Sequence, residues 1–255
     1  MVAAALAARG WVRFPADPAL LPWVRAALPL AQAALAEPGA LWRAGGTWFV
    51  GVDALANAPD GSVAGVPLTG RAIEAARHLF GPLPFHRAQL SVTRPGYPRP
   101  DADETAASHR YRLTRDAAHV DGLLPIGAAR RRMIREPHAY ILGLALNPTG
   151  PGAAPLVVWD RSHRIMAAAF ARALVPHDPA GWADVDVTEA YQDARREVFA
   201  RCDRLVLHGQ PGEAVLLHRH LLHGVAPWAD GALAPPDGRI VAYFRPELRN
   251  VRDWL

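Results

Sequence analysis

The stretch FHRAQLSVTRPGYP, residues 85–98, marks the point where the sequence changes from mainly helical to strand-like patterning. Apolar and polar residues alternate along it, as is typical of a strand with one buried face. Four more runs follow, each bounded by Gly, Pro, Asn or Asp: HAYILGLALN (138–147), APLVVWD (154–160), EAVLLHRHLLHGV (213–225) and GRIVAYFRPEL (238–248). Short strands separated by turns predict a mainly β fold.

Before residue 85 the pattern is mostly helical. Helices are expected in MVAAALAARG (1–10), in LPWVRAALPLAQAALAEPG (21–39), ending at Pro38-Gly39, and in LTGRAIEAARHLFG (68–81), with Thr69 as the N-cap and Gly81 at the end. A strand is expected in GTWFVGVDAL (46–55), and a later helix in VTEAYQDARREVFARC (187–202), with Thr188 as its N-cap. We therefore expect a jelly-roll-like sandwich or barrel with a helical layer on one face. It would form a single domain over 1–255, with N-terminal helices and outer strands in 1–84 and the core in 85–250.

Composition narrows the class of protein. The one cysteine, Cys202, excludes an internal disulfide and a cysteine-based metal cluster, and it fits a reducing, cytoplasmic location. No run approaches the roughly 18 apolar residues that span a membrane, so no membrane association is expected. All 28 basic residues are arginines and the net charge is +4, but they form no stripe with aromatic residues, so no nucleic-acid partner is expected. The oligomeric state is not readable from the sequence.

A possible metal site begins at DAAHVDGLL, residues 116–124. His119 and Asp121 are two residues apart, which places both side chains on one face of a strand. The later run 213–225 contains His218, His220 and His223. One of these would complete a set of two imidazoles and one carboxylate, which leaves open coordination positions and suits non-haem Fe(II).

Two arginines could supply the second half of the site. In GRIVAYFRPE (238–247), Arg239 and Arg245 share one strand face because side chains alternate along a strand. If that face points inward, two buried guanidiniums need anions. A dicarboxylate such as 2-oxoglutarate would satisfy them through forked hydrogen bonds.

Taken together, these segments resemble the Fe(II)/2-oxoglutarate-dependent oxygenases, in particular the phytanoyl-CoA dioxygenase family. AAHVDG (117–122) is similar to the family's His-x-Asp strand, and GAAPLVVWDRSHRI (152–165) to its segment ending in Ser-His. PGEAVLLHRHLLHG (211–224) is similar to its strand ending in His-Gly, which selects His223 as the distal ligand. Arg239 follows His223 by 16 residues, where the superfamily places its oxoglutarate-binding arginine, and AARGWVRFP (7–15) resembles an N-terminal family strand.

The resemblance implies a double-stranded β-helix with helices on one outer face. It implies Fe(II) bound by His119, Asp121 and His223, with 2-oxoglutarate as cosubstrate, held by Arg239 with Arg245 as a second contact, and O₂ as the oxidant. The reaction would hydroxylate a C–H bond of a small molecule and release succinate and CO₂. The carboxylate of Asp121 favours hydroxylation over halogenation, because halogenating relatives have a small residue there.

One position departs from the family pattern. The small polar residue two positions after the distal histidine is Val225 here, so Tyr140 or Arg245 is expected to replace its contact with the cosubstrate. By alternation, His218 and His220 should lie on the face opposite His223. The expected substrate pocket is lined by 103–116, 127–137 and 164–188.

The arginines at positions 110, 112, 115, 130, 131, 132 and 135 favour an anionic or polar substrate. The alternative function is a cupin-type metal-binding isomerase, or a non-catalytic small-molecule sensor. Such a protein would share the metal ligands but would have no reason to bury Arg239 and Arg245 beside them.

Overall fold

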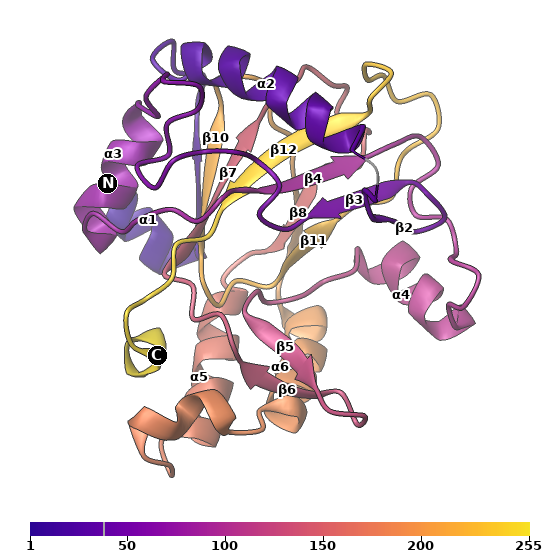
Figure 1. Ribbon diagram of the computed structural model, residues 1–255. Coiled ribbons are helices and arrows are strands. Elements are labelled where there is room, and N and C mark those ends of the chain that lie inside the picture. The colour runs from indigo at the N-terminus through magenta and orange to yellow at the C-terminus, as the bar shows by residue number, and fades with distance from the viewer. Residues whose placement is uncertain (38) are drawn as a thin grey trace.

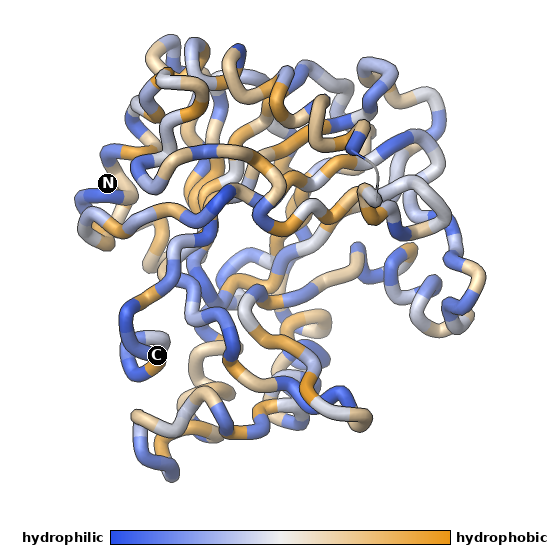
Figure 2. The backbone as a smooth tube through the Cα atoms, viewed as in Figure 1, coloured by the Kyte–Doolittle hydropathy of each residue, from blue (hydrophilic) through white to orange (hydrophobic). Residues whose placement is uncertain are grey.

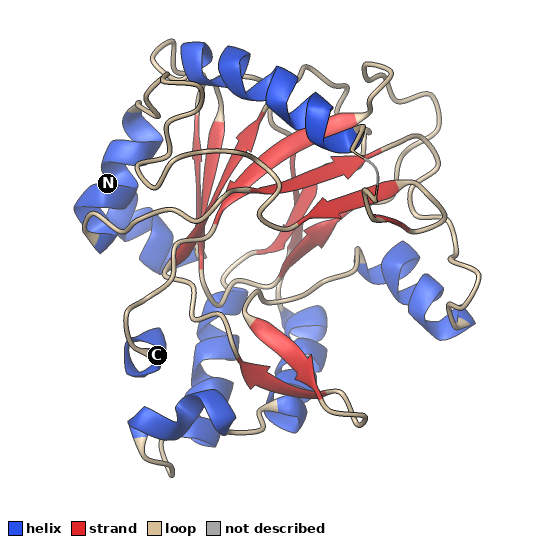
Figure 3. Ribbon diagram, viewed as in Figure 1, coloured by secondary structure: helices blue, strands red, loops and turns tan. Residues whose placement is uncertain are grey.

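The computed structural model describes residues 1–37 and 39–255, and it consists of antiparallel sheets flanked by helices (Figures 1 and 3). The helices are α1 (Val2–Arg9), α2 (Leu21–Leu35), α3 (Arg71–Phe80), α4 (Ala106–Arg115), α5 (Ser162–Leu174) and α6 (Thr188–Arg201), with short 3₁₀ helices η1 (Pro179–Asp184) and η2 (Val251–Trp254). The strands are β1 (Trp11–Phe14), β2 (Trp42–Arg43), β3 (Trp48–Gly51), β4 (Gln89–Thr93), β5 (Leu123–Ile126), β6 (Arg131–Ile134), β7 (Tyr140–Ala145), β8 (Leu156–Trp159), β9 (Arg204–Leu207), β10 (Ala214–His218), β11 (His223–Val225) and β12 (Arg239–Phe244).

Two sheets form the centre of the molecule. The larger has seven strands in the order β1-β10-β7-β12-β4-β3-β2, and the smaller has three in the order β11-β8-β9. An isolated antiparallel bridge between His119 and His223 extends the smaller sheet by the segment before β5. Apolar side chains from both sheets pack together, among them Ile141 of β7, Leu156 of β8 and Leu217 of β10. The space between the sheets is therefore the interior toward which alternate residues of each strand point.

The outer face of the large sheet is covered by α2 and α3. Alternate residues of β7 and β12, such as Leu142 and Phe244, pack outward against Trp23 of α2 and Ile73 of α3. The Phe244 ring lies 5.7 Å from Trp23 and 4.7 Å from Phe85 between ring centroids. Figure 2 shows this apolar layer between α2 and the sheet. Apolar residues at every second position of the strands and at helical spacing in α2 and α3 thus pack into one shared core.

A second helical group was not expected. Helices α5 and α6 pack against each other below the sheets, with the β5–β6 hairpin and η2 beside them (Figure 1). The sequence interpretation treated 164–188 as an insertion lining the pocket, whereas the first half of this range belongs to helix α5. Met166, Phe170 and Leu174 recur at helical spacing and are fully buried in α5. The helices therefore form two groups, not one layer on one face.

Two predicted N-caps are also wrong. Thr69 precedes α3, but the backbone N–H of Arg71 donates to Asp17 Oδ2 at 2.8 Å. Thr188 is the first residue of α6, and its N–H donates to Asp186 Oδ1 at 2.9 Å. Gly81 ends α3 as predicted.

The boundaries of the other N-terminal helices follow the sequence pattern closely. Helix α1 lies within the expected segment 1–10. Helix α2 ends at Leu35, and Pro38 of the predicted end at Pro38-Gly39 lies outside the described residues. Among the helices described, none has the length and apolar character needed to cross a membrane.

Candidate metal centre

Backbone hydrogen bonds bring His119 and His223 together from distant parts of the chain. The N–H of His119 donates to the carbonyl of His223 at 2.8 Å, and the N–H of His223 donates to the carbonyl of His119 at 3.0 Å. The two residues are therefore cross-strand partners, and their ring centroids lie 4.6 Å apart. The spacing of these imidazoles is fixed by pairing within the small sheet.

Each imidazole is anchored by the nitrogen that faces away from Asp121. Nδ1 of His119 donates to the carbonyl of Ala117 at 2.9 Å, and Nδ1 of His223 donates to the carbonyl of Leu221 at 2.9 Å. A carbonyl can only accept, so both rings carry the proton on Nδ1. Nε2 is then the nitrogen of each ring that is left to bind a metal, as in metal-binding histidines whose other nitrogen donates to a carbonyl.

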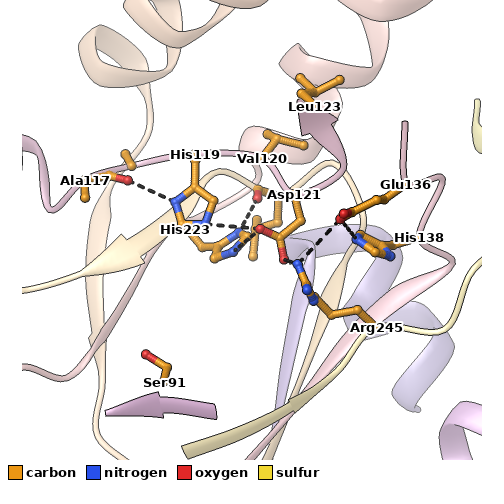
Figure 4. Close-up of polar contacts among 12 residues, drawn as sticks. Ser91, Ala117, His119, Val120, Asp121, Leu123, Glu136, His138, His223 and Arg245 are labelled. Carbon is orange, nitrogen blue, oxygen red and sulfur yellow. Dashed lines mark hydrogen bonds and ion pairs between the residues drawn. The ribbon is translucent and has the colours of Figure 1, made fainter. Parts of the chain in front are cut away.

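Asp121 faces both imidazoles with a single oxygen (Figure 4). Its Oδ1 lies 3.1 Å from Nε2 of His119 and 3.7 Å from Nε2 of His223. One nitrogen or oxygen from each of the three residues lies within 4.8 Å of the others. The other carboxylate oxygen, Oδ2, faces Arg245 with Nη1 at 3.6 Å. The geometry gives two nitrogens and one oxygen converging on one point.

Charges at the centre are arranged to keep the carboxylate ionised. Burial raises the pKa of Asp121, but the hydrogen bond from His119 and the charges of His223 and Arg245 hold it well below its usual value. Desolvation works against the charged form of His119, but the hydrogen bond and charge of Asp121, together with the bond to the Ala117 carbonyl, outweigh it and raise the pKa of His119. Burial and the neighbouring His119 lower the pKa of His223 to about 4. Asp121 ionised and His223 neutral are the protonation states that a metal needs.

The centre opens onto a cavity of about 400 Å³ between the sheets. The side chain of His119 is 41% exposed on this side, whereas those of Asp121 and His223 are 13% and 8% exposed. The other residues lining the cavity are Trp48, Gln89, Ser91, Ile141, Leu156, Gly224, Val225, Tyr243 and Arg245. A small molecule in this cavity would therefore lie beside all three residues.

Arg239 lies on the same inward face of β12, beyond Tyr243. It is 6% exposed and lines a neighbouring cavity of about 420 Å³, which shares Leu156 and Tyr243 with the first. Within residues 1–37 and 39–255, Arg239 forms no ion pair, and its buried Nη1 has no hydrogen-bond partner. A buried guanidinium without an anion is costly, because its desolvation is not compensated.

Two more buried polar atoms near Arg239 have no partner in the described chain. The Oγ1 atom of Thr93 is one; Thr93 pairs directly with Arg239 across β4 and β12. The hydroxyl of Tyr97 is the other. Burial raises the pKa of Tyr97, and the nearby guanidiniums of Arg112 and Arg239 partly oppose this. Two hydroxyls without partners beside an unpaired guanidinium form a site suited to a carboxylate.

Three residues near the candidate site, Thr93, Tyr97 and Tyr243, were not predicted from the sequence. A signal for Thr93 was available, because residues 89, 91 and 93 alternate onto the inner face of β4. Tyr243 lies between Arg239 and Arg245 on the face already singled out, and it lines both cavities. Tyr97 follows the strand in an irregular segment, where periodicity carries no information.

The prediction for Tyr140 is wrong. Tyr140 lies on the outer face of β7, is 1% exposed, and packs on Phe80 with ring centroids 4.7 Å apart. On β7 it is the next residue, Ile141, that lines the metal-centre cavity. One step along a strand reverses the face, so Tyr140 does not contact the cavity.

His218 and His220 lie away from the centre, but not for the reason expected. The run 213–225 is not one strand: β10 ends at His218, a turn includes His220, and β11 begins at His223. Strand alternation therefore does not apply across it. The two rings lie beside each other, with centroids 5.2 Å apart, and His218 also neighbours His163 at 5.0 Å.

The arginine-rich segments do not line the cavity of the metal centre. Arg112 pairs with Glu104, Arg131 with Asp186 and Arg135 with Asp184. None of the seven arginines singled out in the sequence is among the described residues that line this cavity. Their density therefore gives no support for an anionic substrate.

No protein-family model and no curated protein sequence matches the chain. Among solved structures, it is similar to AviO1 from Streptomyces viridochromogenes Tue57, with 15% identity and a TM-score of 0.52 over 98% of this chain and 96% of AviO1. This chain has the fold of AviO1. EvdMO1 is 15% identical with a TM-score of 0.50, over 95% of this chain and 48% of EvdMO1. SnoK, described as a non-heme alpha ketoglutarate dependent carbocyclase from nogalamycin biosynthesis, is 11% identical with a TM-score of 0.49, over 96% and 83% of the two chains.

Proposed function

We propose that this protein is an Fe(II)- and 2-oxoglutarate-dependent dioxygenase that hydroxylates a C–H bond of a small molecule. His119, Asp121 and His223 would hold the metal, because two imidazole Nε2 atoms and one carboxylate oxygen suit Fe(II) and leave positions open. Bound Fe(II) supplies the chemistry by which O₂ oxidises 2-oxoglutarate to succinate and CO₂ and oxidises the substrate.

The observation that carries the proposal is the buried, unpaired guanidinium of Arg239. A metal-binding jelly roll of cupin type would have no use for a cation without an anion in its interior. Arg239, Thr93 and Tyr97 together offer donors for the far carboxylate of 2-oxoglutarate. Arg239 lies on the strand face that also carries Tyr243 and Arg245 toward the metal centre. A keto diacid would therefore be held at one end by this face while its other end reaches the metal.

The remaining residues orient the ligands and restrict access. The carbonyls of Ala117 and Leu221 fix the imidazole tautomers, and Arg245 neutralises the second oxygen of Asp121. Trp48, Ile141 and Tyr243 line the cavity with apolar surface, which lowers the local polarity around the cosubstrate. The side chain of His119 marks the open side, where substrate would approach.

The strand order supports a double-stranded β-helix as the finer description of the fold. The core of the large sheet runs β10-β7-β12-β4, and the small sheet runs from the His119 bridge through β11 and β8 to β9. Residues 1–84 add outer strands and the covering helices, so we propose one domain over the whole chain. Membership of the phytanoyl-CoA dioxygenase family remains a proposal that rests on the sequence segments quoted above.

The test is uncoupled turnover. Protein reconstituted anaerobically with Fe(II) and then exposed to O₂ and 2-oxoglutarate should release succinate, and Asp121→Ala should abolish this release. Succinate release by the wild type but not by Arg239→Met at low 2-oxoglutarate would support the assigned clamp. A wild type that binds metal but gives no succinate with any of a broad panel of small molecules would favour a cupin-type isomerase or sensor. Gain of one oxygen atom in a product would distinguish hydroxylation from other oxidations.

A further inference from the structure

Arg245 is held between two carboxylates, and only one of them belongs to the metal centre. Its Nη1 lies 3.6 Å from Oδ2 of Asp121 and 3.8 Å from Oε2 of Glu136 (Figure 4). Both distances are longer than a direct hydrogen bond, so the guanidinium is shared and is not closed onto either acid. The side chain of Arg245 is 14% exposed, so water contributes little to its solvation.

Glu136 is itself held in place by His138. Nε2 of His138 lies 3.1 Å from Oε2 of Glu136, the same oxygen that faces Arg245. The His138 side chain is 5% exposed, and the pair forms in the segment between β6 and β7. The hydrogen bond from His138 and the guanidinium of Arg245 lower the pKa of Glu136 although burial opposes this, so this carboxylate is ionised. The result is a chain of contacts from His138 through Glu136 and Arg245 to Asp121.

The backbone fixes Glu136 relative to Asp121. The N–H groups of Arg135 and Glu136 both donate to the carbonyl of Gly122, at 2.9 and 3.3 Å. Gly122 has φ +84°, and a Cβ there would lie 2.1 Å from the carbonyl oxygen of Glu136. The residue after Asp121 is thus a glycine that lets the Glu136 segment cross directly over it.

Without Glu136, Arg245 would have one close carboxylate left in the described chain. A guanidinium beside a single carboxylate pairs with both of its oxygens in a fork. One of those oxygens is Oδ1 of Asp121, which faces the two imidazoles and which a metal would need. The second acid therefore restrains Arg245 from competing with the metal.

We propose that Glu136, oriented by His138, is a positioning residue that holds Arg245 on Oδ2 of Asp121 and so leaves Oδ1 free for the metal. This inference rests on the proposed metal centre, but it concerns residues outside the ligand set. It assigns a role to a Glu-His pair that neither the ligand set nor the cosubstrate clamp requires.

The test measures Co(II) binding, which needs no turnover. Glu136→Gln keeps the shape of the side chain and removes its charge, and it should raise the Co(II) dissociation constant about tenfold, the lower end of the range for outer partners of metal ligands. The visible Co(II) absorption should also change, because Asp121 would bind differently. Glu247→Gln is the matched control: Glu247 lines the same side cavity as Glu136, but among the described residues the ion pairs of Arg245 are with Asp121 and Glu136 and not with Glu247. It should bind Co(II) like the wild type.

A double-mutant cycle tests whether the effect passes through Arg245. In an Arg245→Ala background, Glu136→Gln should change the dissociation constant by less than about twofold. An equal effect in both backgrounds, or an equal effect of Glu247→Gln, would overturn the inference, because it would mean that Glu136 acts only through its charge. Circular dichroism melting of each variant checks that the fold is kept. Failure of the wild type to bind Co(II) would remove the proposed function as well, whereas normal binding by Glu136→Gln would remove only this inference.

Discussion

At the scale of single residues, replacing Arg239 is predicted to weaken the binding of 2-oxoglutarate and to stabilise the protein without it. Arg239→Met should weaken 2-oxoglutarate binding by about 30-fold or more, since breaking a buried charge pair costs about 2–5 kcal/mol. The same substitution should raise the free energy of unfolding of the protein without 2-oxoglutarate, by about 1 kcal/mol, because an uncompensated buried charge is removed. Isothermal titration with Fe(II) replaced by Mn(II), and urea denaturation, measure the two effects. A variant that binds 2-oxoglutarate normally would show that the clamp lies elsewhere.

A second prediction at this scale compares the removal of the hydroxyl from two tyrosines, Tyr97 and Tyr140. Tyr97→Phe should weaken 2-oxoglutarate binding by about tenfold, the effect of one hydrogen bond to a charged group. It should leave the melting temperature unchanged or higher, because the Tyr97 hydroxyl is buried without a partner in the described chain. Tyr140→Phe is the control, since Tyr140 packs in the outer core and should not affect binding. Equal binding by both variants would remove Tyr97 from the site.

The residues of the candidate centre were accessible from the sequence to different degrees. His119 and Asp121 share a short segment, and the His-Gly ending selects His223, so the resemblance could single out all three. The roles of Thr93 and Tyr97 could not be predicted, because a missing hydrogen-bond partner is a property of the packed interior. Tyr140 was misplaced because its strand is apolar on both faces, so that the pattern does not say which face points inward.

At the scale of elements, the hairpin β5–β6 sets the geometry beside Asp121. Gly122→Ala would place a Cβ against the Glu136 carbonyl and strain a backbone with positive φ. We expect a loss of about 1–3 kcal/mol in the free energy of unfolding. Metal affinity should also fall, because the two segments would have to separate. Gly127→Ala, at the tip of the same hairpin with open space around it, controls for the positive φ alone. Similar Co(II) affinities for these two variants would contradict a positioning role for the crossing at Gly122.

Elements were predictable where one periodicity dominates. Strands β4, β7, β8 and β12 and helices α1 to α3 were found from alternation, short apolar runs bounded by turn residues, or helical patterning. Helix α5 was missed because it follows strand β8 with only a short turn, and the family-like Ser-His segment suggested a loop. The break between β10 and β11 was missed because His218 to His223 carries no Gly or Pro to mark a turn.

At the scale of the whole molecule, three buried histidines outside the metal centre predict loss of stability in acid. Burial lowers the pKa of His218 to about 3, that of His220 well below its usual value, and that of His163 to a smaller extent. The unfolded chain therefore binds protons at higher pH than the folded one. Their contribution to stability is complete above about pH 6.5 and is lost as the pH falls toward 3, at about 1.4 kcal/mol per pH unit for each group that stays neutral.

Urea denaturation between pH 7 and 4.5 measures this loss. His220→Leu should make the free energy of unfolding depend less steeply on pH, because one neutral imidazole is removed; its ring contacts Phe170 and Trp254, which leucine can also contact. His119 has a raised pKa and acts in the opposite direction over part of this range. An unchanged slope in the His220→Leu protein would mean that this histidine is protonated in the folded state.

The bridge between His119 and His223 has a consequence for the empty protein. Because reciprocal main-chain bonds pair the two residues, the sheet itself sets the separation of these two ligands. Little reorganisation should accompany loading, and a chelator should strip the ion without unfolding the chain. The same polypeptide could then be refilled with different divalent ions and compared, which makes it a convenient scaffold for asking what each metal contributes.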